Sequence, residues 1–148
     1  MAATTCAVSQ NNDLHARPQS MCFVCGQDNP VGLRIEFQPR DDGGMAAVWT
    51  PGPSLEGFRG IVHGGVVSTV LDEVMSKAVA AAGSEALTAE LRIRYRLPVT
   101  SGGTFLIRGW IVRRSKRLIE TEATLTAQDG RIHAHAWASF LALSKPRP

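Results

Sequence analysis

The sequence predicts an α+β fold in which an antiparallel sheet of about six strands wraps around one long, buried helix. Three observations lead to this prediction. Apolar residues recur at helical spacing over about residues 65–82. Strand-like runs lie on both sides of that segment, and those after it follow one another without a helix, which excludes a doubly wound parallel sheet. The 148 residues are 44% hydrophobic, enough for one domain with a sizeable core.

The segment before the helix is expected to form an arm, a loop and a hairpin. Residues 1–20 are polar and lack periodicity, so we expect a flexible N-terminal arm. Residues 22–33 are rich in Gly, Pro and Asn, which favours an ordered loop. Strands are expected over residues 33–38 and 45–50, joined by an Asp- and Gly-rich turn at 41–44.

The predicted helix is apolar over more than half of its circumference, which is typical of a buried helix. Gly83 follows it as a C-terminal stop signal. The apolar positions at helical spacing are Val66, Val67, Val70, Leu71, Val74, Met75, Ala78, Val79 and Ala82.

The part of the chain after the helix is expected to be all strand. Residues 91–97 alternate apolar and arginine side chains, so this strand has one apolar and one cationic face. Asp129-Gly130 is a strong hairpin signal between the last two runs. The other expected strands are 104–112, 118–128 and 131–143, with a turn at 113–116.

One domain is expected over residues 21–144, followed by a short C-terminal tail at 145–148. The net charge of +3 and the pI of about 9.1 fall short of the clustered basic face of a nucleic-acid-binding protein. No apolar run approaches the length of a membrane span, and residues 1–20 lack the pattern of a secretory signal. We therefore expect a cytoplasmic protein that has neither nucleic acid nor membrane as a partner.

The three cysteines do not predict a disulfide framework, because their number is odd. Cys22 and Cys25 form a single Cys-x-x-Cys motif. A structural zinc site needs four ligands, and His63, His133 or His135 could complete one only if the fold happened to bring them there. We therefore expect no metal and no cofactor, and a packing role for these thiols.

His63-Gly64-Gly65 opens directly into the predicted helix. Two glycines at a helix start are costly unless something approaches the backbone closely. The first N–H groups of a helix have no internal partner and can hold an anion or a developing oxyanion. A tight turn that lets the helix pack is the alternative explanation.

The helix carries two neighbouring acids that differ in position. Glu73 falls near the centre of the polar arc, four residues before Lys77, and is expected to be a solvated surface residue. Asp72 falls at the border of the apolar arc, one turn from Ser68 and Met75. A carboxylate in such a place costs free energy to bury, and functional sites commonly account for it. A boundary Asp that bonds to nearby hydroxyls is the structural alternative.

The spacing His63-Gly64-Gly65-(x)6-Asp72 resembles the HGG-(x)6-Asp/Glu signature of hotdog-fold acyl-CoA thioesterases of the PaaI-like class. The run from Leu87 to Pro98, with Thr88 near its start, resembles the strand that follows the central helix in that superfamily. The leader CFVCGQDNPVGL is similar to one found in many of its members. The resemblance covers roughly residues 44–143 and implies a hotdog fold.

The same resemblance implies the catalytic residues of an acyl-CoA thioesterase. Asp72 would be the general base or nucleophile, and the backbone N–H of Gly64 would polarise the thioester carbonyl. Thr88 would hold the attacking water or stand near the scissile bond, and His63 would shape the turn. Gly57 stands where several family members have Asn or Gln, so Arg59 is a candidate for the missing polar contact.

The candidate substrate-binding residues fall into two groups. Gly65, Arg59, Ser68 and Met75 belong to the segment around the expected reaction centre. The resemblance also implies that the basic turn at residues 113–117 would bind the phosphates of CoA, and arginine suits phosphate by bidentate geometry. A solvated hairpin tip is the alternative reading of that turn. Its candidate residues are Arg113, Arg114, Lys116 and Arg117.

Two other functions remain open at this point. A non-catalytic acyl-CoA-binding protein would use the same fold without turnover. Residues 26–32 superficially resemble the motif of hotdog enoyl-CoA hydratases, but Gln27 replaces its Asp and Gly32 stands where its His should be.

A lone sheet around one helix leaves much of the helix uncovered. We therefore expect a homodimer, joined edge to edge with active sites between the subunits, or a dimer-of-dimers tetramer.

Overall fold

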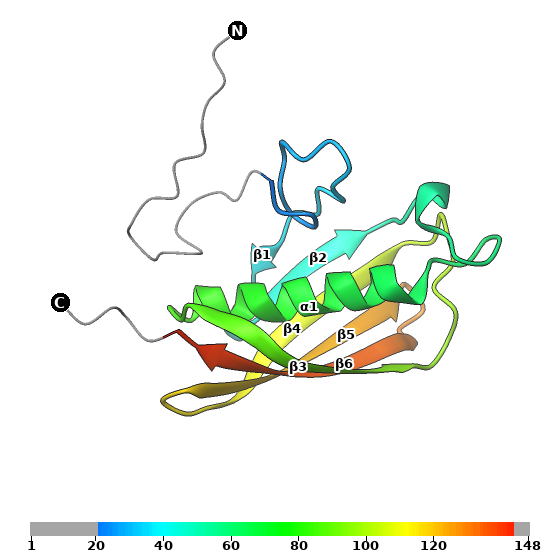
Figure 1. Cartoon of the computed structure of the whole chain (residues 1–148). Helices are drawn as coiled ribbons and strands as arrows, with labels where there is room; N and C mark the ends of the chain where they lie inside the picture. Colours follow the sequence, from blue (N-terminus) through cyan, green and yellow to red (C-terminus); the bar gives the residue numbers. More distant parts are fainter. Residues whose placement is uncertain (1–20, 144–148) are drawn as a thin grey trace, which may run out of the picture.

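The computed structural model describes residues 21–143, so the arm predicted over residues 1–20 and the tail predicted over 145–148 lie outside the described residues. The described chain forms one six-stranded antiparallel sheet with the strand order β1-β2-β4-β5-β6-β3. One helix, α1, lies along one face of this sheet (Figure 1). The elements are β1 (Gln38–Pro39), β2 (Met45–Trp49), the short 3-10 helix η1 (Pro53–Leu55), α1 (Gly64–Ala81), β3 (Ala86–Tyr95), β4 (Phe105–Arg114), β5 (Leu118–Ala127) and β6 (Ile132–Ala142).

A row of small residues explains how close the helix lies to the sheet. Gly109, Ala123 and Ala136 stand side by side in register across β4, β5 and β6. A Cβ atom on Gly109 would lie 2.9 Å from the backbone of Val74 in α1. The helix therefore packs closely against the sheet along this row, and larger side chains fill the core on either side of it.

The helix prediction is confirmed to within one residue at each end. His63 caps its start, and Gly83 follows its end in the left-handed conformation, with φ +79°. The buried face of the helix consists of Val67, Val70, Leu71, Val74, Met75, Ala78 and Val79.

The edge strand β3 contains a β-bulge that changes which side chains face the helix. The pairing of β3 with β6 shifts by one residue between Thr88 and Glu90. Side chains alternate along a strand, so without this shift Thr88 would share a face with Arg92. The bulge instead places Thr88 on the helix side together with Tyr95, while Arg92 stacks on Trp137 on the opposite face.

The strand expected over residues 33–38 is largely wrong, because β1 has only two residues. The backbone N–H groups of Leu33 and Ile35 donate instead to the carbonyls of Phe23 and Val24. The preceding segment (residues 21–33, the leader loop) therefore folds back along this stretch and takes up its hydrogen bonds. Val24 and Ile35 are buried, which ties the leader loop to the core.

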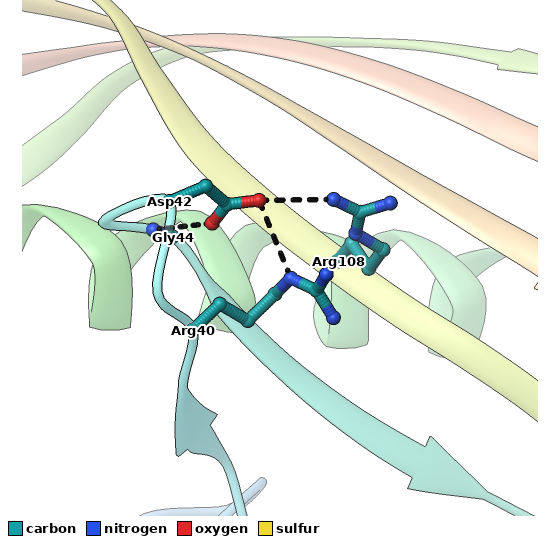
Figure 2. A network of polar contacts seen from close by, with 4 residues as sticks. All are labelled: Arg40, Asp42, Gly44 and Arg108. Carbon is teal, nitrogen blue, oxygen red and sulfur yellow. Dashed lines mark hydrogen bonds and ion pairs between the residues drawn. The ribbon is translucent and has the colours of Figure 1, made fainter.

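The turn between β1 and β2 is held by one carboxylate, as Figure 2 shows. Asp42 accepts hydrogen bonds from the Gly44 N–H at 3.1 Å, from Arg108 at 3.2 Å and from Arg40 at 3.4 Å. The Gly44 N–H, followed by the two guanidinium groups, lowers the pKa of Asp42 below 3.8. These three contacts join the turn at Asp42 to its own backbone and to β4.

Strands β2, β4, β5 and β6 agree with their predictions to within two residues, whereas β3 begins at Ala86, five residues before the predicted start at residue 91, and ends at Tyr95. Arg113 and Arg114 belong to β4, so the turn is shorter than expected and lies between Arg114 and Leu118. Within residues 21–143, no helix combines the length and apolar character that a membrane span requires.

Candidate active site

The start of α1 leaves one backbone donor without a partner. His63 Nδ1 accepts the Gly65 N–H at 2.9 Å, and the His63 carbonyl accepts those of Val66 and Val67. Among residues 21–143 no acceptor is found for the N–H of Gly64. Because this donor also sits at the positive end of the helix dipole, it is suited to an anionic oxygen.

The two glycines at this helix start have different surroundings. A Cβ atom on Gly65 would lie 3.0 Å from Nδ1 of the His63 ring, so the capping contact itself requires a small residue there. A Cβ atom on Gly64 would make only ordinary contact, at 3.5 Å, with the Tyr95 side chain. No contact within residues 21–143 therefore requires glycine at position 64, and its bare backbone permits close approach of a ligand.

Asp72 and Thr88 meet on the helix side of β3. The Thr88 hydroxyl donates a hydrogen bond of 2.9 Å to Asp72 Oδ1. Within the described residues no protein donor reaches Oδ2 of Asp72, so one carboxylate oxygen is held and the other is available. Asp72 is half-buried and Thr88 is exposed, so the pair stands at the edge of the core and not inside it.

Burial raises the pKa of Asp72 above the ordinary 3.8. The Thr88 hydrogen bond opposes this rise by stabilising the carboxylate, and the charge of neighbouring Glu73 adds to it. A raised pKa makes the carboxylate a stronger base, which favours proton abstraction from water.

A cavity of about 460 Å³ opens beside the start of the helix. His63, Gly64 and Tyr95 contribute polar groups to its wall, and Asp72 and Thr88 do not line it. Apolar side chains form much of the rest of the wall, among them Phe58, Ile61, Val67 and Leu97. Phe58 also lines this cavity and is 82% exposed.

Gly64 and Asp72 are too far apart to act on one atom within a single chain. Eight residues separate them on α1, which corresponds to about 12 Å along the helix axis at 1.5 Å per residue. A carbonyl oxygen bound at Gly64 therefore lies well outside the reach of the carboxylate of the same chain.

The other residues expected near the reaction centre lie in different places. The Ser68 hydroxyl donates to the carbonyl of Gly65 at 2.7 Å, so it is tied to its own helix. Arg59 is exposed in the loop before the helix, next to Phe58. The substrate-binding prediction for Met75 is not supported in this chain, because its side chain is fully buried between helix and sheet.

The basic turn lies at the far end of the helix from Gly64. Arg114 donates to the carbonyl of Ala82, just after α1, at 3.0 Å, and Arg113 forms an ion pair with Glu120. Lys116 and Arg117 are exposed. Eighteen residues of helix, about 27 Å, separate this end from Gly64.

Sequence reasoning did not name Tyr95 as a site residue, and it gave Glu73 the wrong surroundings. The Tyr95 hydroxyl donates to the Gly64 carbonyl at 2.7 Å and so braces the helix start against β3. Tyr95 lies on the apolar face of the strand predicted over residues 91–97, and this position could have identified it as a residue that faces the helix. Glu73 pairs with Lys77 at 3.5 Å as expected, but the expectation that it is solvated is wrong, because the leader loop covers it and its side chain is only 18% exposed.

The family model of the thioesterase superfamily, 4HBT, matches residues 59–134, which include the helix start, Asp72 and Thr88. Acyl-coenzyme A thioesterase THEM4 of Xenopus laevis is 28% identical over 100 residues, covering 67% of this chain and 45% of that protein. The chain thus spans about half the length of this relative.

Solved structures share the fold. The crystal structure of RHA08564, a thioesterase superfamily protein, has a TM-score of 0.78 and 27% identity, over 81% of this chain and 62% of that one. A hypothetical thioesterase of Streptococcus pneumoniae TIGR4, crystallised with coenzyme A, has a TM-score of 0.70 and 20% identity, over 76% of this chain and 88% of that one. The predicted hotdog fold is confirmed, and the chain belongs to the thioesterase superfamily.

Proposed function

We propose that this protein is an acyl-CoA thioesterase that hydrolyses a thioester to a carboxylic acid and free CoA, with Asp72 as its catalytic carboxylate. The observation that carries the proposal is the Thr88–Asp72 hydrogen bond, which orients a half-buried carboxylate and leaves its second oxygen free. The name of the Xenopus laevis relative and the coenzyme A bound by the Streptococcus pneumoniae protein support the substrate class.

The carboxylate can act in either of two ways. As a general base, it takes a proton from water while the water oxygen attacks the thioester carbon and the sulfur leaves as CoA thiol. As a nucleophile, it attacks the carbonyl carbon and expels CoA as the thiolate, which gives a mixed anhydride; water then hydrolyses the anhydride to the carboxylic acid and restores the carboxylate. Either route places negative charge on the carbonyl oxygen, where the free Gly64 N–H would stabilise it.

We propose that the complete site combines two copies of the chain. Gly64 and Asp72 lie about 12 Å apart along α1, so each would work with the other group from a neighbouring subunit. β3 lies at the sheet edge, and antiparallel pairing of two β3 strands would generate a two-fold dimer.

The contacts of β3 with the helix suggest the register of that dimer. Thr88 lies beside Asp72, and Tyr95 lies beside Gly64. A two-fold pairing centred near Leu91 and Arg92 sets Thr88 of one copy opposite Tyr95 of the other. Each Asp72 then faces the Gly64 N–H across the interface.

The nucleotide end of CoA is proposed to extend toward the basic turn. Ala82 lies about 15 Å from Asp72 along the helix, and the turn is anchored there by Arg114. Lys116 and Arg117 are exposed and available for phosphate at that end. Gly65 and Arg59 belong to the opposite end of the site, where the Gly65 N–H donates to the capping His63 and Arg59 is exposed in the loop before the helix.

The test is release of free thiol from a series of alkyl and aryl acyl-CoAs by the wild type and by Asp72→Asn. We expect turnover with at least one substrate and a loss of kcat of about 10²-fold or more in the variant, because proton transfer contributes on this scale. Thr69→Val serves as a control on the same helix, since its hydroxyl only donates to the Gly65 carbonyl. Unchanged turnover in Asp72→Asn would refute the assignment, and binding without turnover by the wild type would favour a non-catalytic acyl-CoA-binding protein.

A further inference from the structure

Three ligand-type side chains converge between the leader loop and the central helix. The thiols of Cys25 and Cys22 lie 3.3 and 3.6 Å from the same oxygen, Oε1 of Glu73. The two sulfur atoms and the carboxylate oxygen all lie within 4.8 Å of one another, and all three residues are half-buried. The proposed thioesterase chemistry uses none of them.

The local backbone holds the two thiols in place. The Gly26 N–H donates to the Cys22 carbonyl at 2.9 Å, which closes a tight turn, and the Cys25 N–H points at Cys22 Sγ at 3.5 Å. This contact fixes the Cys22 sulfur beside the backbone of Cys25. Glu73 projects toward the turn from the middle of α1, a rigid element, so the third ligand is also fixed in position.

The spacing of these atoms matches that of a tetrahedral metal site. With Zn–S of about 2.3 Å and Zn–O of about 2.0 Å, sulfur and oxygen ligands on one tetrahedron lie about 3.5 Å apart. The observed distances from Glu73 Oε1 to the sulfur atoms of Cys25 and Cys22, 3.3 and 3.6 Å, lie just below and just above this value. Two thiolates and a carboxylate carry three negative charges, which a divalent ion and the ammonium of Lys77, 3.5 Å from Glu73, would balance.

We propose that Cys22, Cys25 and Glu73 bind a zinc-class divalent ion that pins the leader loop to the central helix. The fourth tetrahedral position is left for water, because three protein ligands face the ion. The role of the ion is structural and independent of the thioesterase proposal, since it fastens the loop that lies over the outer face of α1.

A redox Cys-x-x-Cys centre fits these surroundings less well. Reactive thiols of that kind lie in electropositive, accessible surroundings. Here the Glu73 carboxylate lies 3.3 and 3.6 Å from the two sulfur atoms, and both cysteines are half-buried.

The experiment uses the full, reduced chain with Zn²⁺, and with Co²⁺ as a spectroscopic substitute. We expect about one Zn²⁺ per chain after dialysis, thiolate-to-cobalt charge-transfer absorption with Co²⁺, and a higher Tm with Zn²⁺ than after chelation. Cys22→Ser, Cys25→Ser and Glu73→Gln should each weaken Zn²⁺ binding at least tenfold, since even outer-shell changes cost about 10–100-fold.

Two control variants make the result specific. Glu36→Gln alters an exposed carboxylate just beyond the leader loop, and Cys6→Ser removes the third thiol of the chain; both should keep the metal. Circular dichroism checks that each variant is folded. A reduced wild type that binds no Zn²⁺, a Cys22–Cys25 disulfide in the purified chain, or undiminished binding in Glu73→Gln would each overturn the proposal.

Discussion

The Thr88 hydroxyl donates a hydrogen bond of 2.9 Å to Asp72, although strict strand alternation would turn these two side chains away from each other. The bulge between Thr88 and Glu90 in β3 makes the contact possible. It adds one residue to the strand, so that Thr88 faces the helix on one side of the bulge and Tyr95 faces it on the other.

Thr88→Val should reduce kcat by about 10- to 100-fold, because a hydrogen bond to a charged group contributes about 1.5–3 kcal/mol. Valine keeps the shape and the β-branch of threonine, so the fold should be unaffected. Steady-state thiol release measures the loss, and Thr88→Ser, which retains the hydroxyl, should recover most of it. Equal losses in the two variants would show that packing, and not the hydrogen bond, matters here.

The pH profile of kcat/KM should have an acid limb above the ordinary Asp pKa of 3.8, because burial raises the pKa of Asp72. Activity requires the carboxylate, so kcat/KM falls as the pH drops through that raised pKa. The measurement is kcat/KM against pH with a substrate that does not titrate in this range. A limb at or below 3.8 would contradict the role given to the half-buried carboxylate.

The same shift predicts how Asp72 affects stability. A raised folded-state pKa means that the native state binds more protons than the unfolded state just above pH 3.8. The stability contributed by this group is therefore fully present below 3.8 and is lost as the pH rises through the folded-state value. Asp72→Asn should consequently match or exceed the wild type in Tm at neutral pH while losing activity, and a marked drop in Tm would argue for a structural role.

Gly64→Pro should lower kcat by about 10²–10³-fold, the usual effect of deleting one oxyanion donor. Proline lacks the N–H but is well tolerated at the first position of a helix. His63 already has φ −57° and ψ 132°, a conformation compatible with a following proline. Gly64→Ala is the matched control, because it keeps the N–H and its Cβ makes only ordinary contact with Tyr95. Thiol release and helical circular dichroism are measured together, and full activity in Gly64→Pro would exclude this donor.

Mixing inactive Asp72→Asn with inactive Gly64→Pro should restore activity if each site combines groups from two chains. Random exchange makes about half of the dimers mixed. In each mixed dimer, one of the two sites combines the intact Asp72 of one chain with the intact Gly64 of the other. About a quarter of wild-type activity is therefore expected. The mixture is refolded together and compared with each variant treated alone. No recovery, despite mass-spectrometric detection of mixed dimers, would place both groups in a single chain.

Gly109→Ala should destabilise the fold by about 1–3 kcal/mol, the usual cost of overpacking a core. The added methyl would lie 2.9 Å from the backbone of Val74, and neither helix nor sheet can easily move. Gly52→Ala is the control, because its Cβ would meet nothing within 4 Å and its φ is −86°. Urea unfolding compares the two, and equal stabilities would mean that the helix does not rest closely on β4.

The sequence by itself determined the architecture of this protein. Helical periodicity marked α1, alternation marked the second half of β3, and strand-like runs between turn signals marked β4 to β6. The spacing from His63 to Asp72 identified the segment that carries the candidate site. These features are local, because the period of apolar residues follows from the geometry of each element alone. The strand expected over residues 33–38 was wrong because its hydrogen bonds go to the leader loop, a partner that no local pattern identifies.

Only the tertiary structure decided which side chains meet. The bulge that turns Thr88 toward Asp72 arises from pairing between β3 and β6, and the period of β3 alone gives no sign of it. Cys22 and Cys25 cover Glu73, although they lie about fifty positions away from it in the chain. Such contacts depend on how separate elements pack in three dimensions, and that packing sets the burial and charge on which their chemistry rests.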